Sequence, residues 1–108
     1  MKVSYGEDLA EYLADEKACR ARYGVPMTKL IFRRLNQLLA SPTLEAMHNL
    51  GRCHELKGDR AGCFAVDLVH PQRMIFKPDD ETKEYLEGRE IKWPKVRSVE
   101  ILSIEDYH

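Results

Sequence analysis

The sequence lacks a long hydrophobic run. No segment of its 108 residues reaches the roughly 18 consecutive apolar residues typical of a membrane-spanning helix. Residues 1–8 contain no apolar run and end in two acids, so they do not resemble a signal peptide. At 44% hydrophobic residues, the chain is too apolar to be a disordered tail. We therefore expect one globular domain in the cytoplasm, with no membrane partner.

Cysteine is scarce, and its pattern excludes a disulfide framework. The three cysteines, Cys19, Cys53 and Cys63, are odd in number and match no familiar disulfide spacing, which fits a reducing compartment. A zinc site formed by Cys53, Cys63, His54 and His70 is the alternative, but no Cys-x-x-Cys pair supports it. We expect small, partly buried side chains, no metal and no other cofactor.

Acidic residues are absent from a long central segment. Residues 17–44 carry six lysines and arginines and no acid, whereas residues 1–16 and 78–108 each carry an excess of four acids. The formal net charge is only −1, and that total argues against a nucleic-acid partner. Because charges that fold into separate patches attract polyanions locally, the uneven distribution keeps nucleic acid among the expected partners.

Apolar residues at helical spacing predict two helices in the first half of the chain. Over residues 6–22 they share one face, and Gly24 ends this helix as a C′ residue. Pro26 begins the second helix, whose apolar stripe runs through residues 27–39. Ser41 is expected to be the N-cap of a further short helix.

The second half of the chain predicts strands. Residues 63–68 alternate between large apolar side chains and small or polar ones, as in a half-buried strand. Further strands are expected at residues 2–5, 53–56, 73–77 and 96–104. The order predicts a single α+β domain over residues 1–108: an antiparallel sheet with two N-terminal helices packed on one face. Residues 78–95 are expected to form a charged insertion loop.

Three cations and one imidazole fall on or beside the predicted hairpin strands. They are Lys57, Arg60, Arg73 and His54. Cations gathered on one face of a sheet can hold a phosphodiester and stabilise charge that develops on it. The alternative is a solvated hairpin edge with unrelated charges, because exposed charged side chains are mostly ordinary surface.

A second group of cations lies beside the apolar stripe of the second predicted helix. Lys29, Arg33 and Arg34 have a simple interpretation as the solvated face of an amphipathic helix. Solvated helix faces, however, commonly mix charges of both signs. An unmixed basic face can bind along a phosphate backbone, so these three residues are candidate RNA-binding residues.

The sequence ends in Asp106, Tyr107 and His108. Terminal residues are normally frayed and carry no function. Here they follow directly on a predicted β-branched strand that could hold them in place. Imidazole titrates near neutrality, so His108 is a candidate for acid–base catalysis.

Four sequence segments together carry a family resemblance. They are GRCHELKGDR at residues 51–60, FAVDL at 64–68, QRMIF at 72–76 and IEDYH at 104–108. In this order they resemble the HigB branch of the RelE/ParE toxin superfamily, the toxins of type II toxin–antitoxin modules. The resemblance spans nearly the whole chain. The turn motif and the Asp-Tyr-His ending are fairly specific together, and each alone is weak.

This resemblance implies a small α+β fold of the microbial-RNase type and an mRNA interferase that inhibits translation. Such a toxin cleaves mRNA in the ribosome without a metal, by attack of a ribose 2′-OH on the adjacent phosphorus. By position, Lys57 and Arg73 would hold the scissile phosphate and Arg60 would assist.

The same resemblance assigns the remaining candidate residues. His54 and His108 would be the acid and the base, without a choice between the two roles. Tyr107 would stack on a base or donate a proton, and Asp106 would orient His108. The implied partners are the ribosome, mRNA and a cognate antitoxin with a helix-turn-helix motif, encoded by an adjacent gene.

Two features depart from the pattern of the family. Gln72 stands where an aromatic residue commonly precedes the strand arginine, which puts base stacking there in doubt. The acidic segment 78–90 is longer than in the shortest members, and it could cover the site or contact the antitoxin.

Alternative functions stay open because fold does not fix function within this superfamily. A ParE-like toxin that binds and poisons DNA gyrase needs no catalytic residues. An inactive toxin relic is a further alternative. A DNA-binding antitoxin is disfavoured, because the second half of the chain alternates as strands rather than forming a helix-turn-helix.

Overall fold

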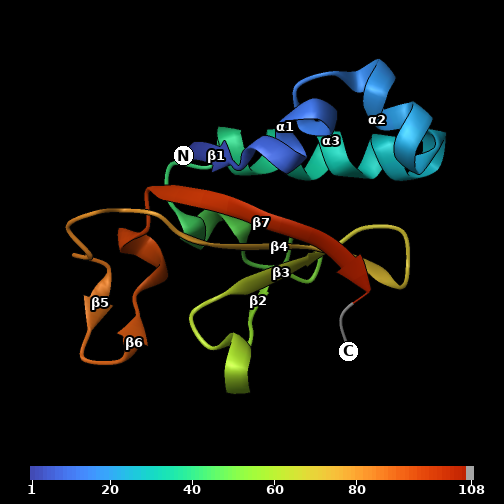
Figure 1. Ribbon diagram of the computed structural model, residues 1–108. Helices are drawn as coiled ribbons and strands as arrows, with labels where there is room; N and C mark the ends of the chain where they lie inside the picture. Colours follow the sequence, from blue (N-terminus) through green and yellow to red (C-terminus); the bar gives the residue numbers. More distant parts are fainter. Residues whose placement is uncertain (107–108) are drawn as a thin grey trace.

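The computed structural model describes residues 1–106 (Figure 1). Its helices are α1 (Glu7–Leu13), α2 (Glu16–Tyr23) and α3 (Val25–Ala40), with 3-10 turns η1 (Leu44–Met47), η2 (Gly58–Arg60) and η3 (Trp93–Lys95). Its strands are β1 (Lys2–Tyr5), β2 (His54–Glu55), β3 (Phe64–Asp67), β4 (Gln72–Pro78), β5 (Leu86–Glu87), β6 (Glu90–Ile91) and β7 (Ser98–Asp106). In this described part of the chain, no helix combines the length and apolarity needed to cross a membrane.

Five strands form the main sheet, in the order β1-β7-β4-β3-β2. All neighbouring strands are antiparallel except β1 and β7, which pair in parallel from Lys2 opposite Ser98 to Tyr5 opposite Ile101. The predicted α+β class is confirmed, but the expectation of an entirely antiparallel sheet is wrong for β1. A parallel pair requires a long crossover, and here the crossover spans almost the whole chain.

The helix predicted over residues 6–22 is two helices. Helix α1 ends at Leu13, and the Asp15 side chain begins α2 by accepting hydrogen bonds from the backbone N–H groups of Lys17 at 3.0 Å and Ala18 at 3.4 Å. An aspartate that satisfies two free N–H groups is a strong N-cap, which favours a new helix start at this point. Gly24 ends α2 with a φ of 86°, as predicted.

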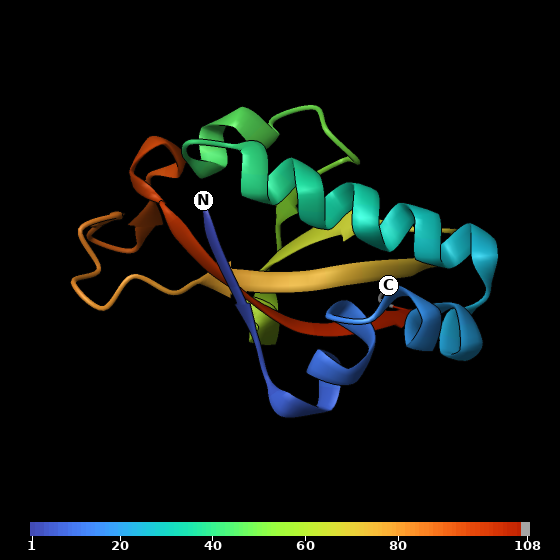
Figure 2. The ribbon, with the colours of Figure 1, turned by 90° about the horizontal axis from the view of Figure 1, so that it is seen from above.

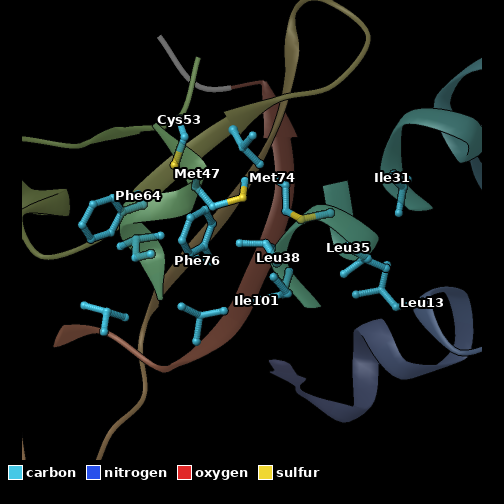
Figure 3. Close-up of a cluster of buried hydrophobic side chains, with 14 of the residues drawn as sticks. Leu13, Ile31, Leu35, Leu38, Met47, Cys53, Phe64, Met74, Phe76 and Ile101 are labelled. Carbon is cyan, nitrogen blue, oxygen red and sulfur yellow. The ribbon is translucent and has the colours of Figure 1, made fainter. Parts of the chain in front are cut away.

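Helix α3 packs its apolar face on the sheet, and α1 and α2 lie on the same side (Figures 1 and 2). Figure 3 shows side chains of α3 near Met74, Phe76 and Ile101 of the sheet. The three sheet residues are at most 1% exposed. Full burial of one such side chain is worth about 1.5–3 kcal/mol. This core therefore fixes the strands that carry the polar residues of the opposite face.

The face of the sheet turned away from α1–α3 is called the open face below. Its β2 end is apolar, because Leu56, Ala65 and Ile75 form a second buried cluster there. The predicted alternation of residues 63–68 is confirmed: Phe64 and Val66 face the helices, and Ala65 lies on the other side. Side chains further along β3, β4 and β7 on the open face are polar.

The segment after α3 differs from the prediction at its cap. Ser41 is the C-cap of α3 rather than the N-cap of the next turn, and its Oγ donates to the backbone O of Gln37 at 2.6 Å. The following turn, η1, has Thr43 as its N-cap. Ser41 can bond backward because the last carbonyls of α3 have no partner within the helix.

Residues 78–95 contain regular structure in place of a plain loop. The hairpin of β5 and β6 is followed by η3. Tyr85 and Ile91 are buried in the main core, and the Trp93 ring lies edge-on against Phe64 at 5.1 Å between centroids. This segment thus packs on the helix side of the sheet. The hairpin lies at the opposite end of the molecule from the end of β7, so it does not cover that end (Figure 1).

Candidate active site

Strand register places charged residues from three strands in one row on the open face. Asp67 of β3 pairs with Arg73 of β4, and Arg73 pairs with Glu105 of β7. Paired residues of neighbouring strands project to the same face. The adjacent row runs from His54 of β2 through Ala65 and Ile75 to Ser103.

One ion pair lies within this row, and a second connects the row to Arg60. Arg73 Nε lies 3.3 Å from Asp67 Oδ1. Arg60 reaches across from η2 and donates from Nη2 to Glu105 Oε1 at 2.7 Å. The Ser103 hydroxyl donates to the other carboxylate oxygen of Glu105. Both candidate phosphate-binding arginines are therefore held beside a carboxylate on the open face.

The backbone of Arg52 fixes the imidazole of His54. His54 Nδ1 lies 2.7 Å from the carbonyl oxygen of Arg52. A carbonyl can only accept, so Nδ1 carries the proton and Nε2 of the neutral ring is left as a proton acceptor. Arg52 has a φ of 54°, in the left-handed region, and its side-chain Nε lies 3.5 Å from Asp67 Oδ2. A continuous series of contacts thus leads from His54 through Arg52 and Asp67 to Arg73.

Lys57 lies at the start of the turn that carries Arg60. It is the N-cap of η2, and Gly58 follows it with a φ of 69°, a conformation that favours glycine. Lys57 is exposed and forms no ion pair with any residue of the described part of the chain. Its ammonium group is therefore available to a ligand on this side of the molecule.

The cations of α3 separate into two kinds. Lys29 and Arg33 are exposed and line a shallow groove with Phe32. Arg34 instead faces the sheet: its Nε donates to the backbone O of Asp67 at 2.7 Å. Burial lowers the pKa of the Arg34 guanidinium, and the neighbouring Arg33 lowers it further. Because α3 covers the face opposite the open face, the structure does not bring Lys29 and Arg33 together with the row at Arg73.

Of the three candidate residues at the end of the chain, the structure describes only Asp106. Asp106 pairs with Gln72 at the end of β7, one register position beyond Arg73 and Glu105, so this pair projects to the face opposite the charged row. Tyr107 and His108 lie outside the described residues, and their predicted roles stay predictions. Gln72 lies on β4 next to Arg73, at the position where the family pattern has an aromatic residue.

Sequence reasoning missed the partners of the cations. Arg52, Asp67, Ser103 and Glu105 all contact a candidate residue or one of its partners. A signal for Asp67 existed, since the alternation of residues 63–68 places it opposite the core. Its pairing with Arg73 depends on strand register, which that alternation does not define.

The backbone and packing at residue 51 require glycine. Its φ is 56°, and a Cβ there would lie 2.7 Å from the Arg34 side chain and 2.7 Å from Val66 Cγ2. Gly51→Ala should lower the free energy of unfolding by about 3 kcal/mol, because left-handed strain and overpacking add. Gly58→Ala is the control: its added Cβ would contact nothing within 4 Å, so about 1 kcal/mol of strain is expected. Equal losses in urea unfolding would contradict this account of Gly51.

The cysteines are buried or partly buried, as expected for structural thiols. Cys19 is fully buried, and the Thr28 hydroxyl donates to its Sγ at 3.5 Å. Among residues 1–106, no three His, Cys, Asp or Glu side chains are arranged to hold a metal ion. Burial raises the pKa of the Cys53 thiol to about 12, which disfavours the thiolate that metals require.

This shift predicts a loss of stability in alkali. The unfolded thiol ionises near pH 9 and the folded one near pH 12, so between these values the unfolded state binds fewer protons. Cys53 should therefore contribute a fall in the free energy of unfolding as pH rises through this window, with a slope approaching about 1.4 kcal/mol per pH unit. Tyr23 and Tyr85 add to the total slope, because burial raises their pKa values as well. Urea unfolding at several pH values should show a smaller slope in Cys53→Ala than in the native chain and in Cys63→Ala. An equal slope in all three would contradict the contribution of Cys53.

Comparison with known proteins places the fold. No family model and no curated protein matches the sequence. The structure is similar to the YoeB/ParE toxin from Agrobacterium tumefaciens, with a TM-score of 0.62, 16% identity and 100% of both chains covered. It is also similar to YoeB in a YoeB–YefM complex from Staphylococcus aureus, with a TM-score of 0.59, 18% identity and coverage of 100% of this chain and 97% of the other. The chain therefore has the fold of YoeB and ParE toxins, and the closer resemblance to HigB stays a prediction.

Proposed function

We propose that this protein is the toxin of a type II toxin–antitoxin module and cleaves mRNA on the ribosome. The observation that carries the proposal is the contact series on the open face. It joins His54, Arg52, Asp67 and Arg73. Arg60 is held across the same face by Glu105, the register partner of Arg73. Cations and an imidazole acceptor on one surface are the groups that phosphodiester cleavage requires.

The chemistry assigns a task to each group. The ribose 2′-oxygen attacks the adjacent phosphorus, the bond to the 5′-oxygen breaks, and negative charge grows on the phosphate oxygens. Arg73 and Lys57 stabilise this charge, and Arg60 assists them. One general base removes the 2′ proton, and one general acid supplies a proton to the leaving 5′-oxygen.

His54 is suited to the task of base because its Nδ1 is already bonded to a carbonyl. Its Nε2 can then accept the 2′ proton in the neutral state. With His54 as the base, His108 is the proposed acid. The sequence resemblance supplies the other roles: Asp106 orients His108, and Tyr107 stacks on a base or donates a proton.

The proposed partners are an antitoxin, the ribosome and mRNA. Among the similar structures are YoeB–YefM toxin–antitoxin complexes from Staphylococcus aureus. We propose a cognate antitoxin of the helix-turn-helix type, encoded by an adjacent gene. Lys29 and Arg33, on the opposite side of the sheet from Arg73, are proposed to contact ribosomal RNA phosphates.

Induced expression without antitoxin tests this function against the gyrase alternative. We expect growth arrest and rapid decay of translated mRNA, without induction of the SOS response. Growth arrest with intact mRNA and gyrase-linked DNA breaks would favour a ParE-like gyrase poison. Unimpaired growth with folded protein would indicate an inactive relic.

A further inference from the structure

One carboxylate on the open face lies between two arginines. Asp67 Oδ1 is 3.3 Å from Arg73 Nε, and Asp67 Oδ2 is 3.5 Å from Arg52 Nε. The Arg73 side chain is 21% exposed, whereas that of Arg52 is 77% exposed. Two positive charges therefore share one negative charge, and one of the two guanidinium groups extends into solvent.

The position of this carboxylate is fixed through its backbone. The Asp67 N–H donates to the carbonyl of Gly51 at 2.7 Å, and its carbonyl accepts from Arg34 Nε at 2.7 Å. Strand β3, α3 and the loop that carries Arg52 are thus joined at one residue. The carboxylate can move away from the arginines only by rotating its side chain, since the backbone is held from both sides.

The contacts between Asp67 and the two arginines are ion pairs longer than a charge-assisted hydrogen bond. Charge-assisted N–H···O bonds are typically about 2.7–2.9 Å, shorter than either contact here. Asp67 Oδ1 is buried and has no hydrogen-bond partner among the described residues. Among residues 1–106, the Nε atoms of Arg52 and Arg73 are the ones that lie near Asp67, and the Nη1 and Nη2 atoms of both arginines make no hydrogen bond. These nitrogens are the ones that grip a phosphate in a bidentate manner.

We propose that Arg52 and Arg73 together bind one RNA phosphate, and that Asp67 is an internal anion which competes with that phosphate. The ligand class is a phosphodiester of single-stranded RNA, next to His54. Asp67 holds Arg73 in place in the free protein and releases it when phosphate enters. The assignment deepens the proposed ribonuclease site and rests on it, and it adds Arg52 and Asp67 to the binding residues.

Binding of an RNA that cannot be cleaved tests this proposal without ribosomes. The probe is a hexaribonucleotide with a 2′-O-methyl group at every position, titrated while the arginine Nε–H signals are followed by NMR. In the native chain the signals of Arg52 and Arg73 should shift on binding. Asp67→Asn should bind about tenfold more tightly, because the competing charge is gone and the side-chain shape is retained.

Arg52→Gln should bind about fivefold more weakly and reduce the slope of log affinity against log salt by about 0.7, the value for one lost phosphate contact on a single strand. Two variants with the same charge changes are the controls. Glu84→Gln and Arg89→Gln lie at exposed positions in the 78–95 segment, and each should leave the affinity within about twofold. Thermal melts monitored by circular dichroism confirm that every variant is folded.

Three outcomes would overturn the proposal. Equal or weaker binding by Asp67→Asn would make Asp67 a positioning residue for Arg73. An unchanged salt slope in Arg52→Gln would remove Arg52 from the site. Absence of any shift at Arg52 and Arg73 in both the native chain and Asp67→Asn would exclude phosphate binding there. Because the probe cannot be cleaved, a chain that binds it in this way but leaves mRNA intact would contradict the ribonuclease and not the arginine pair.

Discussion

Arg73→Ala should slow mRNA cleavage by about 10²- to 10³-fold and relieve growth arrest. Arg73 is partly buried on a central strand. Because its position is fixed by the sheet, its guanidinium can stabilise charge that develops on a phosphate once Asp67 has released it. Cleavage of a ribosome-bound mRNA by purified protein gives the rate.

Two further substitutions on β4 separate chemistry from folding. Arg73→Lys keeps the charge beside Asp67 but loses the planar fork, and we expect it to recover only part of the rate. Lys77 projects from the same face of β4 and lies 3.9 Å from Glu100, so Lys77→Ala should cleave at nearly the native rate. Full activity of Arg73→Ala, or an equal loss in Lys77→Ala, would refute the role of Arg73.

His54→Asn should reduce the cleavage rate by about 10²- to 10⁴-fold, the range for loss of a general acid or base. The asparagine amide can still donate to the carbonyl of Arg52, as Nδ1 of the imidazole does at 2.7 Å. The substitution therefore removes the Nε2 acceptor and retains the local hydrogen bond. A reduced rate with an unchanged thermal melt would assign the loss to proton transfer.

His70 supplies the matched control for this substitution. It is an exposed histidine in the turn between β3 and β4, preceding Pro71. His70→Asn should cleave ribosome-bound mRNA at the native rate. Native activity in His54→Asn would show that its imidazole takes no part, and would leave His108 as the remaining candidate for acid–base work.

Individual helices and strands of this fold can be predicted from the sequence, whereas the pairing of strands that are distant in the sequence cannot. Helix α3 follows from its apolar spacing after Pro26, and β3 follows from its alternation. The break before α2 is hard to predict because alanines continue the helical pattern, although Asp15 is a good N-cap. The parallel pairing of β1 with β7 joins Lys2 to Ser98, and no local pattern encodes a contact over that separation.

The candidate site shows the same division. The cations at Lys57, Arg60 and Arg73 could be selected from residue type and from the resemblance. The acids that pair with them could not be selected in this way. Asp67 and Glu105 become partners of the site only because strand register places them on either side of Arg73. Residue type and helical position likewise do not distinguish Arg34 from its neighbour Arg33, and only packing reveals that Arg34 binds the backbone of Asp67.

The chemistry of the RNA ends made in the cell tests the central claim most directly. Attack by the 2′-oxygen with departure of the 5′-oxygen leaves a 5′-hydroxyl on each downstream fragment. Sequencing selective for 5′-hydroxyl ends, after induction without antitoxin, should show new ends inside translated reading frames for the native chain and few for Arg73→Ala. Growth arrest without new 5′-hydroxyl ends, or with the same ends in Arg73→Ala, would contradict a ribonuclease site on the open face.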